Sequence, residues 1–145
     1  DSKKYINELK KWSSMASFKC VINDSKTGKS YQKAIEDESL IGKKVGETVE
    51  GGFLGLEGYK LTIRGGSDSA GFCMRKDIDG PARKRALLGK GVGARIKRNG
   101  MKRRKTVCGN TINSKIVQVN LQVSEYGKTS LADIFAPKEE EAKAE

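Results

Sequence analysis

The stretch "VQVNLQV", residues 117–123, decides the fold class of this chain. Its apolar side chains occupy every second position, at Val117, Val119, Leu121 and Val123, with Gln or Asn between them. An alternation with a period of two predicts a β-strand that has one face in the core and the other face polar. The same pattern in "YKLTIRGG" predicts a second strand, and "FKCVIN" and "SYQKAIE" around the turn "DSKTGK" predict a β-hairpin.

Glycine-rich turns separate these short runs, and the 145-residue chain has a length typical of one domain. Together they predict a mainly β fold, a small antiparallel β-barrel-like domain with basic loops. "SLADIFA" predicts a short C-terminal helix with Ser130 as its cap, and "DSKKYINELKKWSS" predicts a helical or tag-like N-terminal extension. We therefore expect an extension over residues 1–14, the barrel domain over 15–136, and an acidic tail over 137–145.

The positive charge of the chain is concentrated in one segment. The sequence has 29 Lys and Arg residues against 18 Asp and Glu, a net charge of +11. Residues 81–124 contain twelve of the basic residues and no acidic one, so the other 17 basic residues are balanced by the 18 acidic ones. Because a field of one sign repels itself, this segregation indicates a polyanionic partner. The candidate contacts in this segment are Arg83, Lys84, Arg85, Lys90, Arg95, Lys97, Arg98, Lys102, Arg103, Arg104 and Lys105.

The residue types that most enzymes and metal sites need are scarce. The sequence has no His, which removes the commonest general base and metal ligand and every His-activated nucleophile. Its three Cys residues form no C-x-x-C pair, which argues against a zinc site or a disulfide scaffold and favours a reducing compartment. "GGSDSAGF" and "GKGVG" lack the context of a phosphate-binding loop, and Asp77 and Asp79 are typical of a turn. We expect no catalytic residue, metal, cofactor or small-molecule substrate.

Three interpretations of the basic segment remain: a solvated charged loop, a nuclear-import signal at Lys102–Lys105, and an RNA-binding surface. RNA binding is favoured because Arg bridges phosphate oxygens or stacks on a base, and Lys supplies a mobile charge. No aromatic residue lies between Phe72 and Tyr126, which favours folded RNA over single strands bound by base stacking. The sequence has neither an apolar run of membrane-spanning length nor a leader pattern, so we expect a soluble, cytoplasmic protein without a membrane partner.

Three blocks of the sequence carry a resemblance to a known family. They are "LEGYKLTIRGGSDSAGFCMRKDIDGPARKRALLGKGVG", "KRRKTVCGNTI" and "IVQVNLQV". In order and spacing they closely resemble the small-subunit ribosomal protein six of archaea and eukaryotes, from about Met15 to Phe135. The resemblance implies a six-stranded β-barrel-like domain in the lower body of the small ribosomal subunit. It would be bound to rRNA and neighbouring ribosomal proteins, with a structural role and no catalysis.

The resemblance also implies roles for single residues. It adds Arg75 and Lys76 to the rRNA contacts and carries over Arg83, Arg85 and Lys102–Lys105. The glycines that it implies as loop-shaping are Gly65, Gly66, Gly71, Gly91, Gly93 and Gly109. The chain departs from the family at Cys73, where Pro is usual, and at Cys108, where Arg is usual, and "ARIKRNG" replaces a Pro-bearing stretch. An acidic tail stands where eukaryotic members have a long basic helix, so the short archaeal type resembles this chain more closely.

The expected function is therefore that of a structural constituent of the small ribosomal subunit that binds and stabilises folded rRNA. The alternative, from a different class of protein, is a free regulatory module whose basic segment docks on acidic proteins or anionic lipid. Both interpretations depend on the same acid-free segment, and they differ in the polyanion that faces it.

Overall fold

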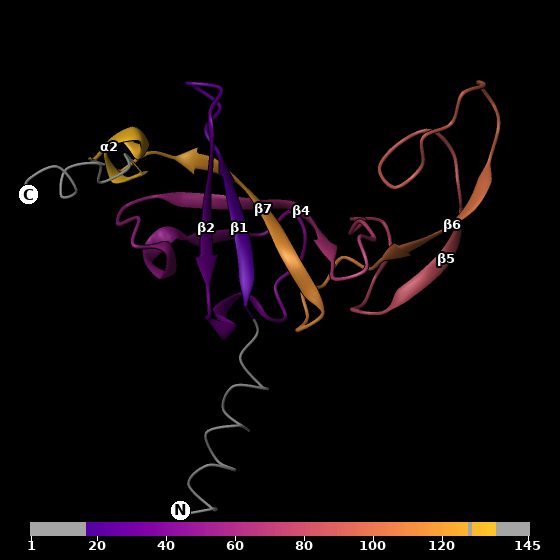
Figure 1. Ribbon diagram of the computed structural model, residues 1–145, viewed down its shortest axis with the longest axis horizontal. Coiled ribbons are helices and arrows are strands. Elements are labelled where there is room, and N and C mark those ends of the chain that lie inside the picture. Colours follow the sequence, from indigo (N-terminus) through magenta and orange to yellow (C-terminus); the bar gives the residue numbers. More distant parts are fainter. Residues whose placement is uncertain (1–16, 128, 136–145) are drawn as a thin grey trace, which may run out of the picture.

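The chain folds into a five-stranded sheet and a separate two-stranded arm (Figure 1). The computed structural model describes residues 17–127 and 129–135. Their elements, in chain order, are β1 (Phe18–Asn23), β2 (Ser30–Ile35), the 3-10 helix η1 (Glu38–Leu40), β3 (Thr48–Glu50), the 3-10 helix η2 (Gly51–Leu54), β4 (Lys60–Asp68), β5 (Arg83–Leu88), β6 (Arg103–Cys108), β7 (Ile116–Glu125) and the helix α2 (Leu131–Phe135).

The predicted strand "VQVNLQV" is β7, and it lies at the centre of the sheet, whose order is β2-β1-β7-β4-β3. β7 pairs parallel with β1 and antiparallel with β4, and the other neighbours pair antiparallel. Val119, Leu121 and Val123 are buried, as the alternation predicts. The expectation for Val117 is wrong, and Ile116 is buried in its place. The register with β4 shifts at that end of the strand and leaves Val117 without a partner there.

β1 and β2 form the predicted hairpin, and its turn explains the sequence "DSKTGK". The Asp24 carboxylate accepts hydrogen bonds from the Lys26 backbone N–H at 2.9 Å and from the Thr27 hydroxyl at 2.7 Å. Gly28 then takes a φ of 70°, a left-handed conformation that Gly adopts without steric cost. This reversal sets the register in which the apolar residues of β1 face the core.

The sheet is open over the described residues, and the prediction of a β-barrel is wrong. β2 and β3 are its two edges, and they do not pair with each other. Lys33 Nζ on β2 donates a hydrogen bond to the Leu54 carbonyl of η2 at 2.7 Å. A side chain and a 3-10 turn therefore span the gap that a barrel closes with a backbone ladder. The remaining strands, β5 and β6, pair with each other instead of joining the sheet.

The main core lies on one face of the sheet and extends to the base of the arm. Its fully buried members from β1, β4 and β7 are Phe18, Cys20, Ile22, Leu61, Ile63, Val119 and Leu121. Met74 and Cys108 continue the same cluster toward the arm. Burial of this apolar surface is the dominant force that stabilises the sheet and the attachment of the arm.

Helix α2 confirms the predicted short C-terminal helix. The Ser130 hydroxyl caps it by accepting a hydrogen bond from the Asp133 N–H at 3.3 Å. Phe135 stacks on Tyr31 of β2, with ring centroids 5.0 Å apart, so the helix covers part of that edge strand. The predicted N-terminal extension over 1–14 and acidic tail over 137–145 lie outside the described residues.

Candidate nucleic-acid interface

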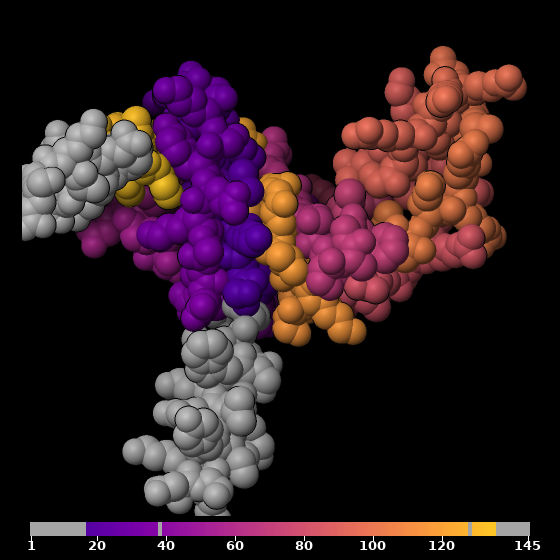
Figure 2. Space-filling model, in the orientation of Figure 1, coloured from indigo at the N-terminus to yellow at the C-terminus, as the bar shows by residue number. Residues whose placement is uncertain are grey.

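The arm, defined here as residues 83–108, consists of β5, β6 and the loop between them. It contains eleven Lys and Arg residues and no Asp or Glu. Figure 1 shows the arm projecting beside the body, which is the five-stranded sheet with its core, and Figure 2 shows the surface hollowed between the two. Most of the positive charge of the acid-free segment 81–124 therefore lies on one two-stranded element outside the main sheet.

A small apolar cluster orders the arm. β5 and β6 pair antiparallel along their whole length. Leu88, Ala94 and Val107 are buried together, so the loop folds back over one face of the hairpin. Gly93 has a φ of 81°, and a Cβ at this position would lie 2.9 Å from Val107 Cγ1, so Gly is required for this approach. The long cationic side chains are left around this cluster and exposed to solvent.

The arm is attached to the body through a buried carboxylate. Asp68, at the end of β4, is 4% exposed, and it accepts hydrogen bonds from Arg83 Nε and the Ser69 hydroxyl. The Arg83 guanidinium also lies over the Phe72 ring, 5.2 Å from its centroid. Arg83 holds the pKa of Asp68 well below its usual range, and Asp68 in turn raises the pKa of Arg83. Arg83, a predicted RNA contact, is thus ion-paired at the base of the arm.

Arg75 joins the loop of the arm to the segment that precedes it. Its Nε and Nη2 donate to the two carboxylate oxygens of Asp77 at 2.9 and 2.7 Å, and its Nη1 donates to the Val92 carbonyl at 2.5 Å. The hydrogen bonds with Asp77 raise the pKa of Arg75 and lower the pKa of Asp77. Arg75 therefore positions the loop through three hydrogen bonds within the protein.

The other predicted contacts are free cations. All of them are exposed: Lys76, Lys84, Arg85, Lys90, Arg95, Lys97, Arg98, Lys102, Arg103, Arg104 and Lys105. Among the described residues, no carboxylate lies within ion-pair distance of any of these side chains. Eleven uncompensated charges on and beside one element create a strong local positive potential, which is complementary to a surface of phosphates.

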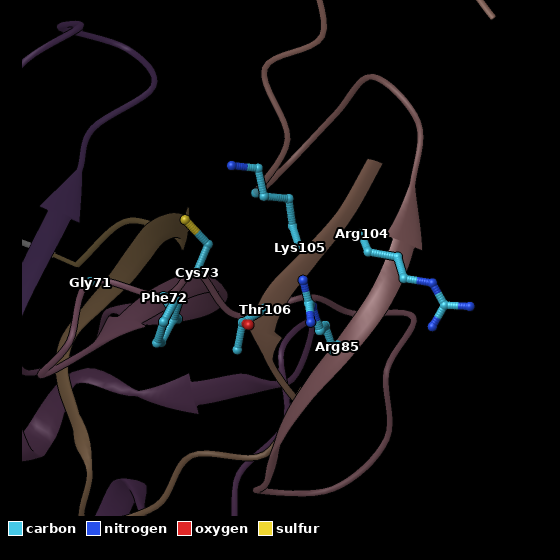
Figure 3. Close-up of a pocket in the computed structure, with 8 residues that line it drawn as sticks. Gly71, Phe72, Cys73, Arg85, Arg104, Lys105 and Thr106 are labelled. Carbon is cyan, nitrogen blue, oxygen red and sulfur yellow. The ribbon is translucent and has the colours of Figure 1, made fainter. Parts of the chain in front are cut away.

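A hollow of about 510 Å³ lies between the arm and the body. Phe72 and Cys73 line it from the body, and Arg85, Arg104 and Lys105 line it from the arm (Figure 3). Figure 3 shows Arg104 and Lys105 pointing to opposite sides of β6, as alternation along a strand requires. Cations therefore stand on both faces of the arm.

Two of the six glycines expected to shape loops lie within a strand. Gly65 and Gly66 belong to β4, and Gly66 packs so closely on β7 that a Cβ would overlap the Gln118 carbonyl oxygen. Gly109 follows β6 and packs in the same way against the Gly80 carbonyl. The remaining three, Gly71, Gly91 and Gly93, lie between the strands that the structure describes.

Comparison with known proteins adds to this geometry. The model of the family described as ribosomal protein S6e matches residues 18–136. The chain belongs to this family. Three archaeal relatives, each named "Small ribosomal subunit protein eS6", are similar over most of their length. The protein of Methanococcus maripaludis is 52% identical over 114 residues, which cover 79% of this chain and 92% of the relative. That of Methanocaldococcus jannaschii is 51% identical over 121 residues (83% and 92%), and that of Methanosphaera stadtmanae is 47% identical over 127 residues (86% and 96%).

Cys108, where the family resemblance leads us to expect Arg, is buried at the base of the arm. The three cysteines are free, and Cys20 and Cys108 are buried. Desolvation is the main cause that raises the pKa of Cys108 to about 11, so the thiol is protonated at neutral pH and packs as a small apolar side chain. Its Sγ lies 3.4 Å from the Asp68 carboxylate. Position 108 therefore belongs to the attachment of the arm and not to its exposed cationic surface.

Sequence reasoning missed Asp68 and Asn110, two polar residues that organise the base of the arm. Asn110 is 6% exposed, and its Nδ2 donates to Asp79 Oδ1 at 2.8 Å. Its Oδ1 accepts a hydrogen bond from the Gly80 N–H at 3.3 Å, so it braces the turn before β5. The signal that could have identified both is their position inside the blocks that carry the family resemblance.

Asp77 and Asp79 do not form a catalytic pair. They take separate partners, Arg75 and Asn110, and so are not arranged as an acid and a base. Over residues 17–127 and 129–135, no group of three or more His, Cys, Asp or Glu residues is placed to hold a metal ion. Within the same part of the chain, no helix has the length and apolar character needed to cross a bilayer.

Proposed function

We propose that the chain is a structural constituent of the small ribosomal subunit that binds folded rRNA through the arm. As a member of a ribosomal protein family, it is a non-enzymatic component of the cytoplasmic ribosome. Its partners are the small-subunit rRNA and the neighbouring small-subunit proteins. The functional unit is the expected domain over 15–136, with the extension 1–14 and the tail 137–145 outside it.

The observation that carries rRNA binding is the set of exposed arm cations without a carboxylate partner among the described residues. Each phosphate that such a cation neutralises releases condensed counterions, and this release drives binding. The anchored side chains of Arg75 and Arg83 support the proposal differently, since they fix the loop and the base of the arm to the body. A preoriented arm loses less conformational entropy when it binds a folded partner.

Replacing Arg103 and Arg104 together with Ala tests this proposal. Both side chains are exposed in β6, so the variant should fold normally. Its affinity for protein-free small-subunit rRNA should fall, and the slope of log affinity against log salt should flatten by roughly 0.7 to 0.9 for each phosphate that the variant no longer neutralises. The measurement is a binding titration of the full chain over a series of salt concentrations.

The matched control is Lys43→Ala with Lys44→Ala, which removes the same charge from an exposed part of the body. We expect the control to change the salt slope by less than half as much. An unchanged slope for the arm variant would show that Arg103 and Arg104 do not contact phosphates. Equal weakening of binding to rRNA and to anionic lipid vesicles would favour the docking module instead.

A further inference from the structure

We propose that a groove between β4, β7 and the arm receives the base of one unpaired rRNA nucleotide; this inference rests on the proposed function. The groove has a volume of about 460 Å³, within the range of small-molecule sites. The lining residues used in the argument are Arg64, Gly65, Arg75, Lys76, Val92 and Asn120. Of these, only Arg75 and Lys76 belong to the contacts that the sequence predicts.

The floor of the groove is bare main chain next to a bulge. β4 pairs Ile63 with Leu121 and then Gly65 with Asn120, so Arg64 has no partner on β7. Such bulges re-aim a side chain, and Arg64 is exposed, without an ion-pair partner among the described residues. A Cβ added at Gly65 would meet no atom within 4 Å, so this part of the strand faces open space. A planar base can therefore approach the peptide backbone directly.

Asn120 supplies hydrogen bonding at the same place. It stands opposite Gly65 on the polar face of β7, and its Oδ1 accepts a hydrogen bond from Gln118 Nε2 at 2.9 Å. This bond fixes the orientation of the amide and leaves both Nδ2 hydrogens without a partner among the described residues. The Asn amide can donate to the Watson–Crick edge of an unpaired base, an edge that base pairing occupies in double-stranded RNA.

The groove also carries charge for the phosphates that flank such a base. Arg64 and Lys76 are both exposed and lie on its lining. The one carboxylate on the lining, Asp77, is already neutralised by its two hydrogen bonds from Arg75. Arg75 also holds Val92 in place, and Val92 is 62% exposed, so it offers an apolar surface to a base or ribose.

The groove is continuous with the cationic hollow of the arm. Cys73 lines both, and the neighbours Val92 and Gly93 line one each. An RNA backbone bound by Arg85 and Lys105 would therefore pass the entrance of the groove. That position suits a nucleotide that is turned out of a folded RNA, whose base edge and face are available for recognition.

The test is an NMR titration of the isotope-labelled full chain with each of the four nucleoside 5′-monophosphates, with ribose 5-phosphate as the reference without a base. We expect at least one nucleotide to bind at least tenfold more tightly than ribose 5-phosphate. The saturable shifts should include the Gly65 and Val92 amides and the Asn120 side-chain amide. Arg64→Ala, at an exposed bulge, and Asn120→Ala should each reduce this preference at least fivefold.

Lys29→Ala is the matched control, since it removes one exposed charge from the turn between β1 and β2, outside the lining of the groove. It should alter nucleotide affinity less than twofold, and so should the Arg103 and Arg104 double variant. Equal affinity for nucleotides and ribose 5-phosphate, or NMR shifts confined to the arm, would overturn the proposal that the groove binds a base. If that happens while the arm variant still flattens the salt slope with rRNA, the groove alone fails and the proposed function stands.

Discussion

Arg83 belongs to the arm by sequence, but its side chain is bound to the body through Asp68. We expect Asp68→Asn to lower the free energy of unfolding by about 1 to 2 kcal/mol at pH 7, because a charge-assisted hydrogen bond is removed and Arg83 retains access to water. The folded-state pKa of Asp68 lies below its unfolded value of about 3.9. Its stabilisation is therefore complete above about pH 5 and is lost as the pH falls toward the folded-state pKa.

Denaturant unfolding of the unmodified chain and of the Asp68→Asn variant, from pH 3 to pH 7, measures this effect. The difference in unfolding free energy should be constant above pH 5 and should shrink below about pH 4. Asp24, whose pKa is lowered to about 2, chiefly by the Tyr126 hydroxyl, is present in both proteins and so cancels in the difference. A difference that grows on acidification would contradict the assigned role of the ion pair.

Substitutions at Leu121 test whether this single side chain lies in the core. It is fully buried in the central strand β7, so Leu121→Asp places a carboxylate where no partner is available among its apolar neighbours. We expect a loss of roughly 4 kcal/mol or more, enough to unfold a marginal domain. Leu121→Ile keeps the volume and should cost less than about 1.5 kcal/mol. Thermal unfolding followed by circular dichroism compares the two variants.

At the scale of elements, the contact of Gly109 with Gly80 sets how the arm leaves the body. Gly109→Ala would overlap the Gly80 carbonyl oxygen, so we expect the backbone at the base of the arm to shift, at a cost of about 1 to 3 kcal/mol. Hydrogen exchange should increase in β5 and β6 and remain unchanged in β1 and β7. Gly89→Ala, where a Cβ would meet no atom within 4 Å, is the control. Equal protection of the arm in both variants would show that this contact does not hold it.

Single elements of the fold could be predicted from the sequence because their signals are local. The alternation that predicts β7 and the Asp24 turn of the first hairpin both lie within a few residues. Strand order could not be predicted, since nothing in the local pattern of β1 indicates that it pairs parallel with β7. The barrel prediction failed at that level. The cations of the arm could be predicted from composition. The role of Asp68 could not, because it depends on a contact with Arg83, fifteen positions later in the chain.

At the scale of the whole molecule, the net positive charge lies on the arm and not on the body. Sedimentation should therefore show whether the partner of the arm is the small ribosomal subunit. In a sucrose gradient at low salt, we expect the full chain to sediment with small ribosomal subunits, since its charge is complementary to rRNA. As the salt concentration is raised, the Arg103 and Arg104 double variant should dissociate from the small subunits at a lower salt concentration than the unmodified chain. A chain that stays at the top of the gradient at low salt would be a free docking module.

The parallel pairing of β1 with β7 also fixes an order of events during synthesis. Among the described strands β1 is made first and β7 last, so Cys20 and Ile22 lack their partners on β7, Val119 and Leu121, until that strand has left the exit tunnel. β5 and β6 need only each other, and hairpins close in microseconds. A nascent chain would thus present a formed cationic hairpin while its hydrophobic centre is still incomplete, and completion of the sheet is the late, slow step.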